Sequence, residues 1–140
     1  MSENNNSVPT KHRVVLIIVD NNKILLLYRF KNGEEYYVFP GGGVEDGEEI
    51  LDAATREAKE ETSLDVTVQE LLWEYENNGR IEHFFLVNKF SGELRIGGPE
   101  EERQSPDNVY RLEWVSFEKA RDLKLLPETM KNRVLEHFLK

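Results

Sequence analysis

Hydrophobic positions along most of the chain form short runs of the kind expected for β-strands. Residues 14–19 are an unbroken apolar run, as in a strand buried on both faces, and an asparagine-rich turn follows them. Similar runs recur further along, each bounded by polar or glycine-containing turns. The pattern predicts strands over residues 14–19, 23–30, 36–39, 66–75, 80–90, 94–96 and 110–117.

Three segments carry helix signals instead. The clearest is residues 48–63, with Asp46 as the expected N-cap and Glu49 three residues after it. Residues 117–123 and 127–139 are further predicted helices, the second with a proline near its first turn. The order β-β-β-α-β-β-β-α predicts an α/β fold in which helices cover the faces of a mixed β-sheet.

The length of 140 residues corresponds to one domain. Residues 1–10 are polar and predict a flexible tail, which leaves residues 11–140 as the single domain. The N-terminus has no signal-peptide core, and the longest apolar run is too short to span a bilayer. We therefore expect a cytoplasmic protein with no membrane partner. The absence of cysteine excludes disulfides and cysteine-based metal or nucleophile chemistry.

The charge balance changes what partners are expected. The chain has 27 acidic and 18 basic residues, for a formal net charge of -9. Such a protein repels a phosphate backbone, so we expect no nucleic-acid partner. It repels a free polyphosphate for the same reason. An anionic substrate would therefore need a cation between itself and the protein.

Acidic side chains gather on one side of the first predicted helix. Glu57, Glu60 and Glu61 fall within an arc of roughly 100°, one turn apart. One interpretation is a solvated acidic face. The other residues of the helix argue against it, because an apolar set shares the side of Glu57 and Glu61 and a polar set lies opposite. The apolar set is Ile50, Ala54 and Leu64, and the polar set is Asp52, Thr55, Lys59 and Thr62.

At least two of these carboxylates should therefore point toward the protein body. Buried charges of one sign need a counter-charge, and within the helix Arg56 supplies one positive charge against three negative charges. A divalent cation can supply the rest. Mg²⁺ prefers a few carboxylates together with waters and phosphate oxygens.

A glycine run precedes this helix. Residues 41–43 are all glycine, which is typical of a flexible loop between a strand and a helix. The same run also permits close approach of the backbone to a phosphate or a metal ion, and it makes Gly42 and Gly43 candidate phosphate-binding residues. The sequence leaves both interpretations open.

The residues from Gly42 to Leu64 resemble the Nudix box. They have the form Gly42-x5-Glu48-x7-Arg56-Glu57-Ala58-x-Glu60-Glu61-x-Ser63-Leu64, against the family pattern G-x5-E-x7-R-E-U-x-E-E-x-G-U, where U is a bulky apolar residue. The six charged or glycine positions from Gly42 to Glu61 match. Ala58 is a small version of U, and Ser63 replaces a glycine that helps the chain leave the helix.

The resemblance implies a Nudix-like α/β/α sandwich with a mixed sheet between helices. It also implies a hydrolase acting on phosphorus-containing anhydrides, which cleaves the diphosphate bond of a nucleoside diphosphate linked to another moiety. Mg²⁺ is the implied cofactor, and Mn²⁺ is an alternative because oxygen ligands suit both ions. The implied partner is a small nucleotide-like molecule, and the chain is expected to be a monomer or a homodimer.

The resemblance also assigns roles to residues. It implies that Glu57, Glu60 and Glu61 bind the metal through their side chains, with a further ligand from the Gly41 carbonyl. Arg56 would hold a catalytic glutamate in place. One of these glutamates, or one in a later loop, would accept the proton of the attacking water. Glu48 is expected to support the loop and the helix.

Further candidates lie outside the box. The run Glu100-Glu101-Glu102 is a candidate distal carboxylate site, with Glu101 and Glu102 as the residues to test, and its alternative is a solvated charge run. Arg13 and Arg29 are candidate phosphate ligands or plain surface charges. Aromatic residues that could stack on a base, or pack in the core, are Tyr28, Tyr36, Phe39, Trp73 and Phe85.

The substrate itself is less constrained. Some Nudix subgroups have a proline about fifteen residues past the box, associated with ADP-ribose, and others have a tyrosine slightly further on, associated with dinucleoside polyphosphates. Residues 77–82 occupy that region and contain neither marker. By elimination this favours a (d)NTP or a related nucleotide, with a nucleotide sugar or a dinucleoside polyphosphate as alternatives.

Two other classes of function compete with an enzyme. One is a non-catalytic nucleotide-binding regulatory module on the same fold, which would be stabilised by a ligand without turnover. The other is a nucleic-acid-binding or RNA-processing protein, which the charge of -9 opposes.

Overall fold

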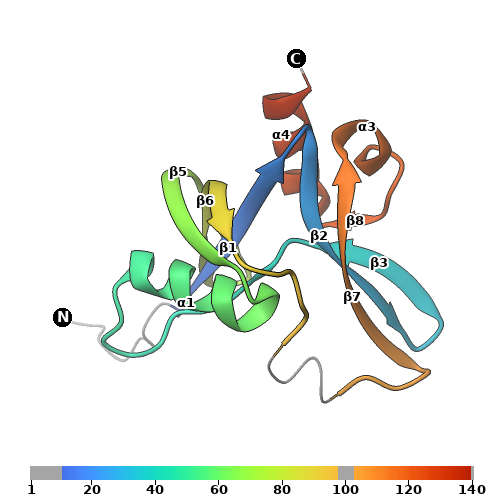
Figure 1. Ribbon diagram of the computed structural model, residues 1–140, viewed down its shortest axis with the longest axis horizontal. Coiled ribbons are helices and arrows are strands. Elements are labelled where there is room, and N and C mark those ends of the chain that lie inside the picture. Colours follow the sequence, from blue (N-terminus) through green and yellow to red (C-terminus); the bar gives the residue numbers. More distant parts are fainter. Residues whose placement is uncertain (1–10, 98–102, 140) are drawn as a thin grey trace.

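The computed structural model describes residues 11–97 and 103–139. Its strands are β1 (Lys11–Asp20), β2 (Lys23–Lys31), β3 (Glu34–Val38), β4 (Gly41–Gly43), β5 (Asp65–Asn77), β6 (Arg80–Ser91), β7 (Asn108–Ser116) and β8 (Leu125–Leu126). Its helices are α1 (Ile50–Thr62), α3 (Phe117–Ala120) and α4 (Glu128–Phe138). The strands form one curled sheet with the order β5-β6-β1-β2-β3-β8, in which β4 pairs with β1 and β7 with β2 (Figure 1).

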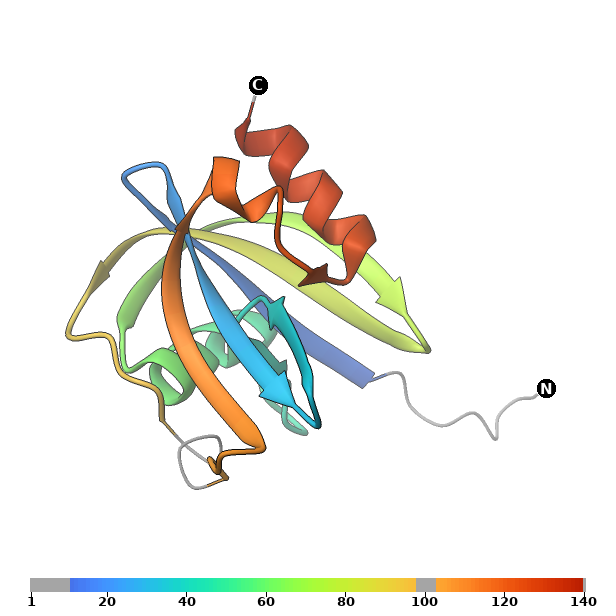
Figure 2. The ribbon, with the colours of Figure 1, turned by 90° about the vertical axis from the view of Figure 1, so that its right-hand side faces the viewer.

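The sheet lies between two layers of helix. Alternate side chains of β1 point to opposite faces, as the pleat of a strand requires. Val14, Leu16 and Ile18 pack in the cluster that contains α1 alanines, whereas Val15 and Ile17 pack in the cluster that contains α3 and α4. Figure 2 shows α4 on one side of the sheet and α1 on the other. The predicted α/β sandwich with a mixed sheet is confirmed, since β1–β6 and β3–β8 are parallel pairs and the others are antiparallel.

Of the interpretations left open for residues 41–43, the flexible loop is not what the structure shows, because these glycines form strand β4. They pair antiparallel with β1, with Gly41 opposite Val15 and Gly42 opposite Val14. A Cβ at Gly41 would overlap the carbonyl oxygen of Val14. Glycine therefore serves here for close packing of one backbone against another rather than for flexibility.

The start of α1 also differs from the prediction. The helix begins at Ile50 with Glu49 as N-cap, rather than at residue 48 after Asp46, and no side chain caps it. The side chain of Glu48 instead accepts a hydrogen bond of 3.0 Å from the backbone N–H of Glu45. This contact draws Glu48 into the loop before the helix.

The end of α1 keeps the left-handed geometry although Ser63 stands where the family has glycine. Ser63 has φ of 68°, and its N–H donates to the Lys59 carbonyl at 3.0 Å. Its hydroxyl donates to the Arg95 carbonyl, and the Arg95 N–H donates to Thr62. Residues 94–96 are thus attached to the helix end and form no strand, contrary to prediction. Thr62 is fully buried, although the helix wheel placed it toward water.

The C-terminal part is more irregular than predicted. The helix expected over residues 117–123 ends at Ala120, and the short strand β8 follows it in parallel with β3. A strand of two residues leaves no recognisable period in a sequence. In the part of the chain that the structure describes, no helix is long and apolar enough to cross a membrane.

Burial of His83 should make the fold sensitive to acid. His83 lies 2.9 Å from His12 and 3.0 Å from Glu74, and burial lowers its pKa below the ordinary 6.5, opposed by Glu74 and reinforced by His12. Because the unfolded chain binds that proton more readily, the free energy of unfolding should fall as pH drops from about 7 to about 5. Urea denaturation should show this fall for the wild type and for the exposed-site control His137→Gln, and a shallower one for His83→Gln. Equal slopes in all three proteins would contradict this prediction.

Candidate active site

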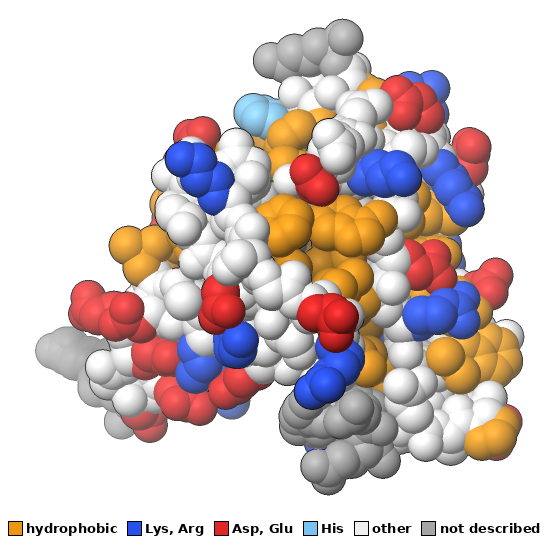
Figure 3. Space-filling view, viewed as in Figure 1, with side chains coloured by type: hydrophobic (Ala, Val, Ile, Leu, Met, Phe, Trp, Pro, Cys, Tyr) orange, Lys and Arg blue, Asp and Glu red, His pale blue; other side chains and the backbone are white. Residues whose placement is uncertain are grey.

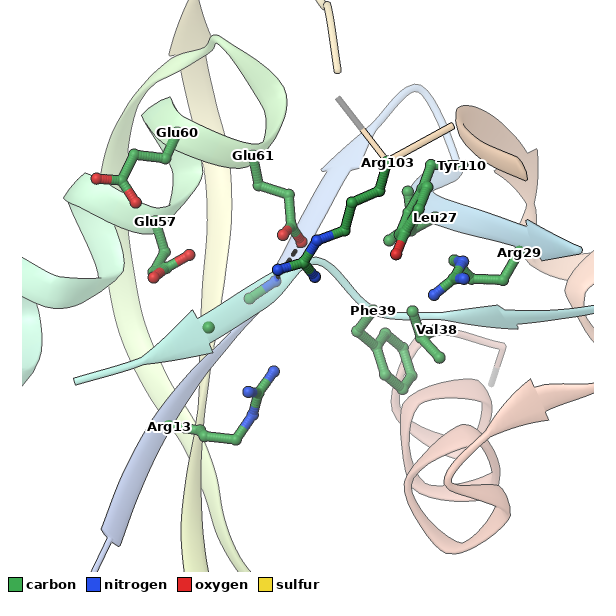
Figure 4. Close-up of a pocket in the computed structure, with 12 residues that line it drawn as sticks. Arg13, Leu27, Arg29, Val38, Phe39, Glu57, Glu60, Glu61, Arg103 and Tyr110 are labelled. Atoms are coloured by element: carbon green, nitrogen blue, oxygen red, sulfur yellow. Dashed lines mark hydrogen bonds between the residues drawn. The ribbon is translucent and has the colours of Figure 1, made fainter. Parts of the chain in front are cut away.

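A polar pocket of about 440 Å³ lies beside α1. Three glutamates of α1 stand at one side and three arginines reach in from other elements (Figure 4). On the face shown in Figure 3, acidic side chains with basic ones among them cover the region of α1. The pocket is lined by Arg13, Leu27, Arg29, Val38, Phe39, Gly41, Gly42, Glu57, Glu60, Glu61, Arg103 and Tyr110.

Glu57 is mostly buried and is held by Arg56. Its side chain is 14% exposed and accepts a hydrogen bond of 2.9 Å from Arg56. Burial raises the pKa of Glu57 above its usual value, while Arg56 acts in the opposite direction. A Cβ at Gly42 would overlap the Glu57 carboxylate. The second glycine of β4 thus gives this carboxylate its space.

Glu61 and Glu60 occupy different environments. Glu61 is buried, with 8% of its surface exposed, and accepts a hydrogen bond of 2.9 Å from the Gly41 N–H. Glu60 is more than half exposed and accepts a hydrogen bond of 3.0 Å from Arg56. The predicted inward orientation of Glu57 and Glu61 is therefore confirmed, and Glu60 lies nearer to solvent.

Arg56 connects the helix to the preceding loop. Its guanidinium donates to both carboxylate oxygens of Glu48, at 2.7 and 2.8 Å, and to the Gly43 carbonyl at 2.9 Å. The same group donates to Glu57 and Glu60. The hydrogen bond from Arg56 lowers the pKa of Glu48 from 4.5 to about 2. Arg56 thus links the loop before α1, strand β4 and two pocket carboxylates. Its contacts with Glu48 are of the kind expected if Glu48 supports the loop and the helix.

The donor set fits a divalent cation. Within residues 11–97 and 103–139 no three acidic or histidine side chains converge as a ready-made metal cage. Mg²⁺ does not need one, because it is held by one or two carboxylates and completes its shell with water and phosphate oxygens. The raised pKa of Glu57 also indicates that Arg56 alone does not balance its charge. The residues that would hold the ion are Glu57, Glu60 and Glu61, with the carbonyl of Gly41.

The arginines that line the pocket come from segments far apart in the sequence. Arg13 comes from β1 and lies 4.0 Å from Glu82. Arg29 comes from β2, and its guanidinium lies 3.7 Å from the ring centroid of Tyr110 on β7. Arg103 precedes β7 and points across the pocket toward the glutamates in Figure 4. A ligand in this pocket would therefore meet both carboxylates and guanidinium groups.

The structure gathers most of the predicted site residues. Arg13, Arg29, Gly41, Gly42 and the three glutamates line this pocket. Arg56 does not line the pocket, and Gly43 lines a neighbouring pocket, where its carbonyl accepts a hydrogen bond from Arg56. Glu101 and Glu102 lie outside the described residues. The chemical roles of all these residues stay predictions.

The sequence did not indicate Arg103 and Tyr110. Tyr110 was assigned only to a strand, and Arg103 was not among the candidate residues. Both reach the pocket through the pairing of β2 with β7, which has no local signal. Among the candidate stacking residues, Phe39 lines the pocket and Tyr36 lies 5.9 Å from Arg29, whereas Tyr28, Trp73 and Phe85 pack in the interior.

Comparisons with known proteins agree with this geometry. The NUDIX domain model matches residues 10–138. An ADP-ribose pyrophosphatase from Methanocaldococcus jannaschii is 35% identical over 77% of this chain and 68% of its own length. An RNA pyrophosphohydrolase from Pelagibacter ubique is 37% identical over 46% of this chain and 41% of its own length.

Solved structures share the fold over most of the chain. The E. coli ORF135 protein is 30% identical with a TM-score of 0.66, and the alignment covers 92% of this chain and 88% of that one. A MutT structure, from Aliivibrio salmonicida and Vibrio cholerae, is 25% identical with a TM-score of 0.71, covering 91% and 95%.

The space beside Gly42 should be needed for metal binding. In Gly42→Ala the new Cβ would displace the Glu57 carboxylate, so we expect Mn²⁺ or Mg²⁺ affinity to fall by about tenfold or more, as for loss of other groups that orient metal ligands. Gly43→Ala is the control, since a Cβ there meets nothing within 4 Å. Calorimetric titration checks both variants, with circular dichroism to confirm folding. Equal affinities would show that Glu57 does not depend on this glycine.

Proposed function

The chain belongs to the NUDIX family and is a hydrolase of pyrophosphate bonds, and from this we propose that it uses Mg²⁺ to cleave a nucleoside diphosphate linked to a further group. The observation that carries the proposal is one pocket lined by both three glutamates and three arginines. Such a pocket suits an anion that approaches together with a cation. Retention of all three box glutamates favours an enzyme over a regulatory module.

The chain's own residues have separable roles in this reaction. Glu57, Glu60 and Glu61 hold the divalent cation, which when bound supplies positive charge at the phosphate oxygens and makes a nearby water more acidic. Arg56 keeps Glu57 and Glu60 in place. A glutamate of this set, or a later one, accepts the proton from the water that attacks phosphorus. The catalysis is then mostly positioning and charge stabilisation.

A second pocket offers room for the rest of the substrate. It has a volume of about 290 Å³ and shares Arg13, Val38 and Phe39 with the glutamate pocket. Its apolar residues would contact a flat or hydrophobic group, and its polar ones would supply hydrogen bonds. The remaining lining residues are Val15, Asn77, Arg80, Glu82, Phe84, Leu126 and Pro127. This combination supports a nucleoside as one part of the substrate.

Two observations favour different nucleotide substrates. The region of residues 77–82 has neither the proline nor the tyrosine marker, which favours a (d)NTP or a related nucleotide by elimination. The relative from Methanocaldococcus jannaschii bears the name of an ADP-ribose enzyme. We keep the (d)NTP as the proposed class, with nucleotide sugars and dinucleoside polyphosphates as alternatives.

A substrate panel tests the proposal directly. The panel contains (d)NTPs, ADP-ribose, a nucleotide sugar, a dinucleoside polyphosphate and 5′-triphosphorylated RNA, assayed by phosphate release with coupled pyrophosphatase or phosphatase. We expect Mg²⁺-dependent turnover of at least one small nucleotide, abolished by EDTA, at about 1 s⁻¹ or faster for the preferred substrate. Product analysis in ¹⁸O-water then identifies the phosphorus attacked. Ligand-induced thermal stabilisation without turnover on any compound would instead support the regulatory module.

The acidic run after β6 is proposed as a source of a further carboxylate. If Glu101 or Glu102 contacts the metal or the attacking water, the double variant Glu101→Ala/Glu102→Ala should lower kcat by about 100-fold while the melting temperature stays unchanged. Glu93→Ala is the matched control, because Glu93 is an exposed acidic residue of the same connection. A near-normal rate in the double variant would identify the run as a solvated charge cluster.

A further inference from the structure

Asn108, at the start of β7, joins two of the pocket arginines through one side chain. Its Oδ1 accepts a hydrogen bond of 2.6 Å from Arg29, and its Nδ2 donates to the Arg103 carbonyl at 3.1 Å. Its backbone N–H and carbonyl both pair with Ser105, at 3.0 and 2.9 Å. Asn108 is thus fixed at the end of a tight turn and connects β2 to the segment that carries Arg103.

Arg29 is held on several sides before any ligand binds. Tyr110 lies directly opposite it in the β2–β7 register, so the ring packs against the guanidinium. The Arg29 Nε also donates to the Val109 carbonyl at 3.3 Å. Of the five N–H groups of a guanidinium, two therefore have acceptors among the described residues, and the others remain available to the pocket. A guanidinium fixed in this way loses little freedom when it binds an anion.

The segment around Arg103 is attached to β7 at a second point. The side chain of Gln104 accepts a hydrogen bond of 3.2 Å from the Tyr110 N–H. Together with the contact from Asn108 to the Arg103 carbonyl, this attaches two adjacent residues of the segment to β7. The Arg103 side chain is then directed across the pocket, as Figure 4 shows.

We propose that Asn108 is a positioning residue, which holds Arg29 and Arg103 so that their guanidinium groups bind the oxygens of a diphosphate in this pocket. The inference rests on the proposed function, because it assumes a diphosphate in this pocket. A planar guanidinium group can bind two phosphate oxygens at once. Two such groups in one pocket fit a doubly charged group. Asn108 is also neutral, so it fixes Arg29 without cancelling the positive charge that the anion needs.

Binding of inorganic pyrophosphate in the presence of Mg²⁺ tests this role without requiring turnover. We expect Asn108→Ala to weaken pyrophosphate binding by about tenfold, as for loss of a hydrogen bond to a charged group. Asn108→Asp should weaken it at least as much, because the carboxylate would neutralise Arg29 and would lose the donor to Arg103. A merely structural amide would tolerate this isosteric change better. Asn88→Ala is the control, since Asn88 is exposed on β6 outside the pocket lining.

A double-mutant cycle shows whether Asn108 acts through the arginines. In the background Arg29→Ala/Arg103→Ala, adding Asn108→Ala should change pyrophosphate affinity by less than about twofold. In turnover assays the single variant should raise KM and leave kcat near the wild-type value. An undiminished loss in the arginine-free background would overturn the proposal, as would unchanged affinity in both Asn108 variants or no pyrophosphate binding by the wild type.

The two proposals can fail separately. If no nucleotide is hydrolysed but pyrophosphate affinity follows the expected pattern, the proposed reaction is wrong and the role of Asn108 stands. If nucleotides are hydrolysed and the Asn108 variants bind pyrophosphate as the wild type does, the role of Asn108 is wrong and the reaction stands. Should Asn108→Ala fail to fold, Asn108→Asp and Arg103→Ala carry the comparison.

Discussion

The carboxylates of Glu57, Glu60 and Glu61 lie on one face of α1, where each raises the electrostatic energy of the other two. Arg56 relieves this repulsion only in part, because it also binds Glu48 and the carbonyl of Gly43. Glu57 and Glu61 face the pocket while Glu60 stays more than half exposed, and burial raises the pKa of Glu57. Under the proposed function, a cation bound with the substrate would remove that cost and would couple metal binding to substrate binding.

The glycine strand β4 makes this arrangement sterically possible. On one side Gly41 packs against the β1 backbone at Val14, and its N–H donates to Glu61. On the other side Gly42 leaves room for the Glu57 carboxylate. The two adjacent glycines are thus needed for different reasons. A Cβ at Gly41 would overlap the β1 backbone, and a Cβ at Gly42 would overlap the Glu57 carboxylate. Pairing with β1 fixes β4, and the contacts of β4 with Glu57 and Glu61 help to fix these two carboxylates.

The arginines of the pocket have a different role from the glutamates. A chain with a net charge of -9 repels a polyphosphate at long range, so binding depends on local positive charge. Arg13, Arg29 and Arg103 supply it from three segments. Contacts from Tyr110 and Asn108 hold Arg29 in place without neutralising it. With carboxylates and guanidinium groups in one pocket of about 440 Å³, the proposed function would bring a cation and an anion into the same site.

The sequence by itself determined the glutamate side of the site, because its parts lie within one helix and the loop before it. Helical periodicity is a local property, so the spacing of Glu57, Glu60 and Glu61 was enough to place them on one face. The alternation of apolar runs likewise predicted most strands and the mixed sheet. Only the tertiary structure decided the arginine side, since Arg29 and Tyr110 meet through pairing of strands about eighty positions apart. It also made a strand of Gly41–Gly43, because the neighbour that selects glycine there is the β1 backbone, which no local pattern records.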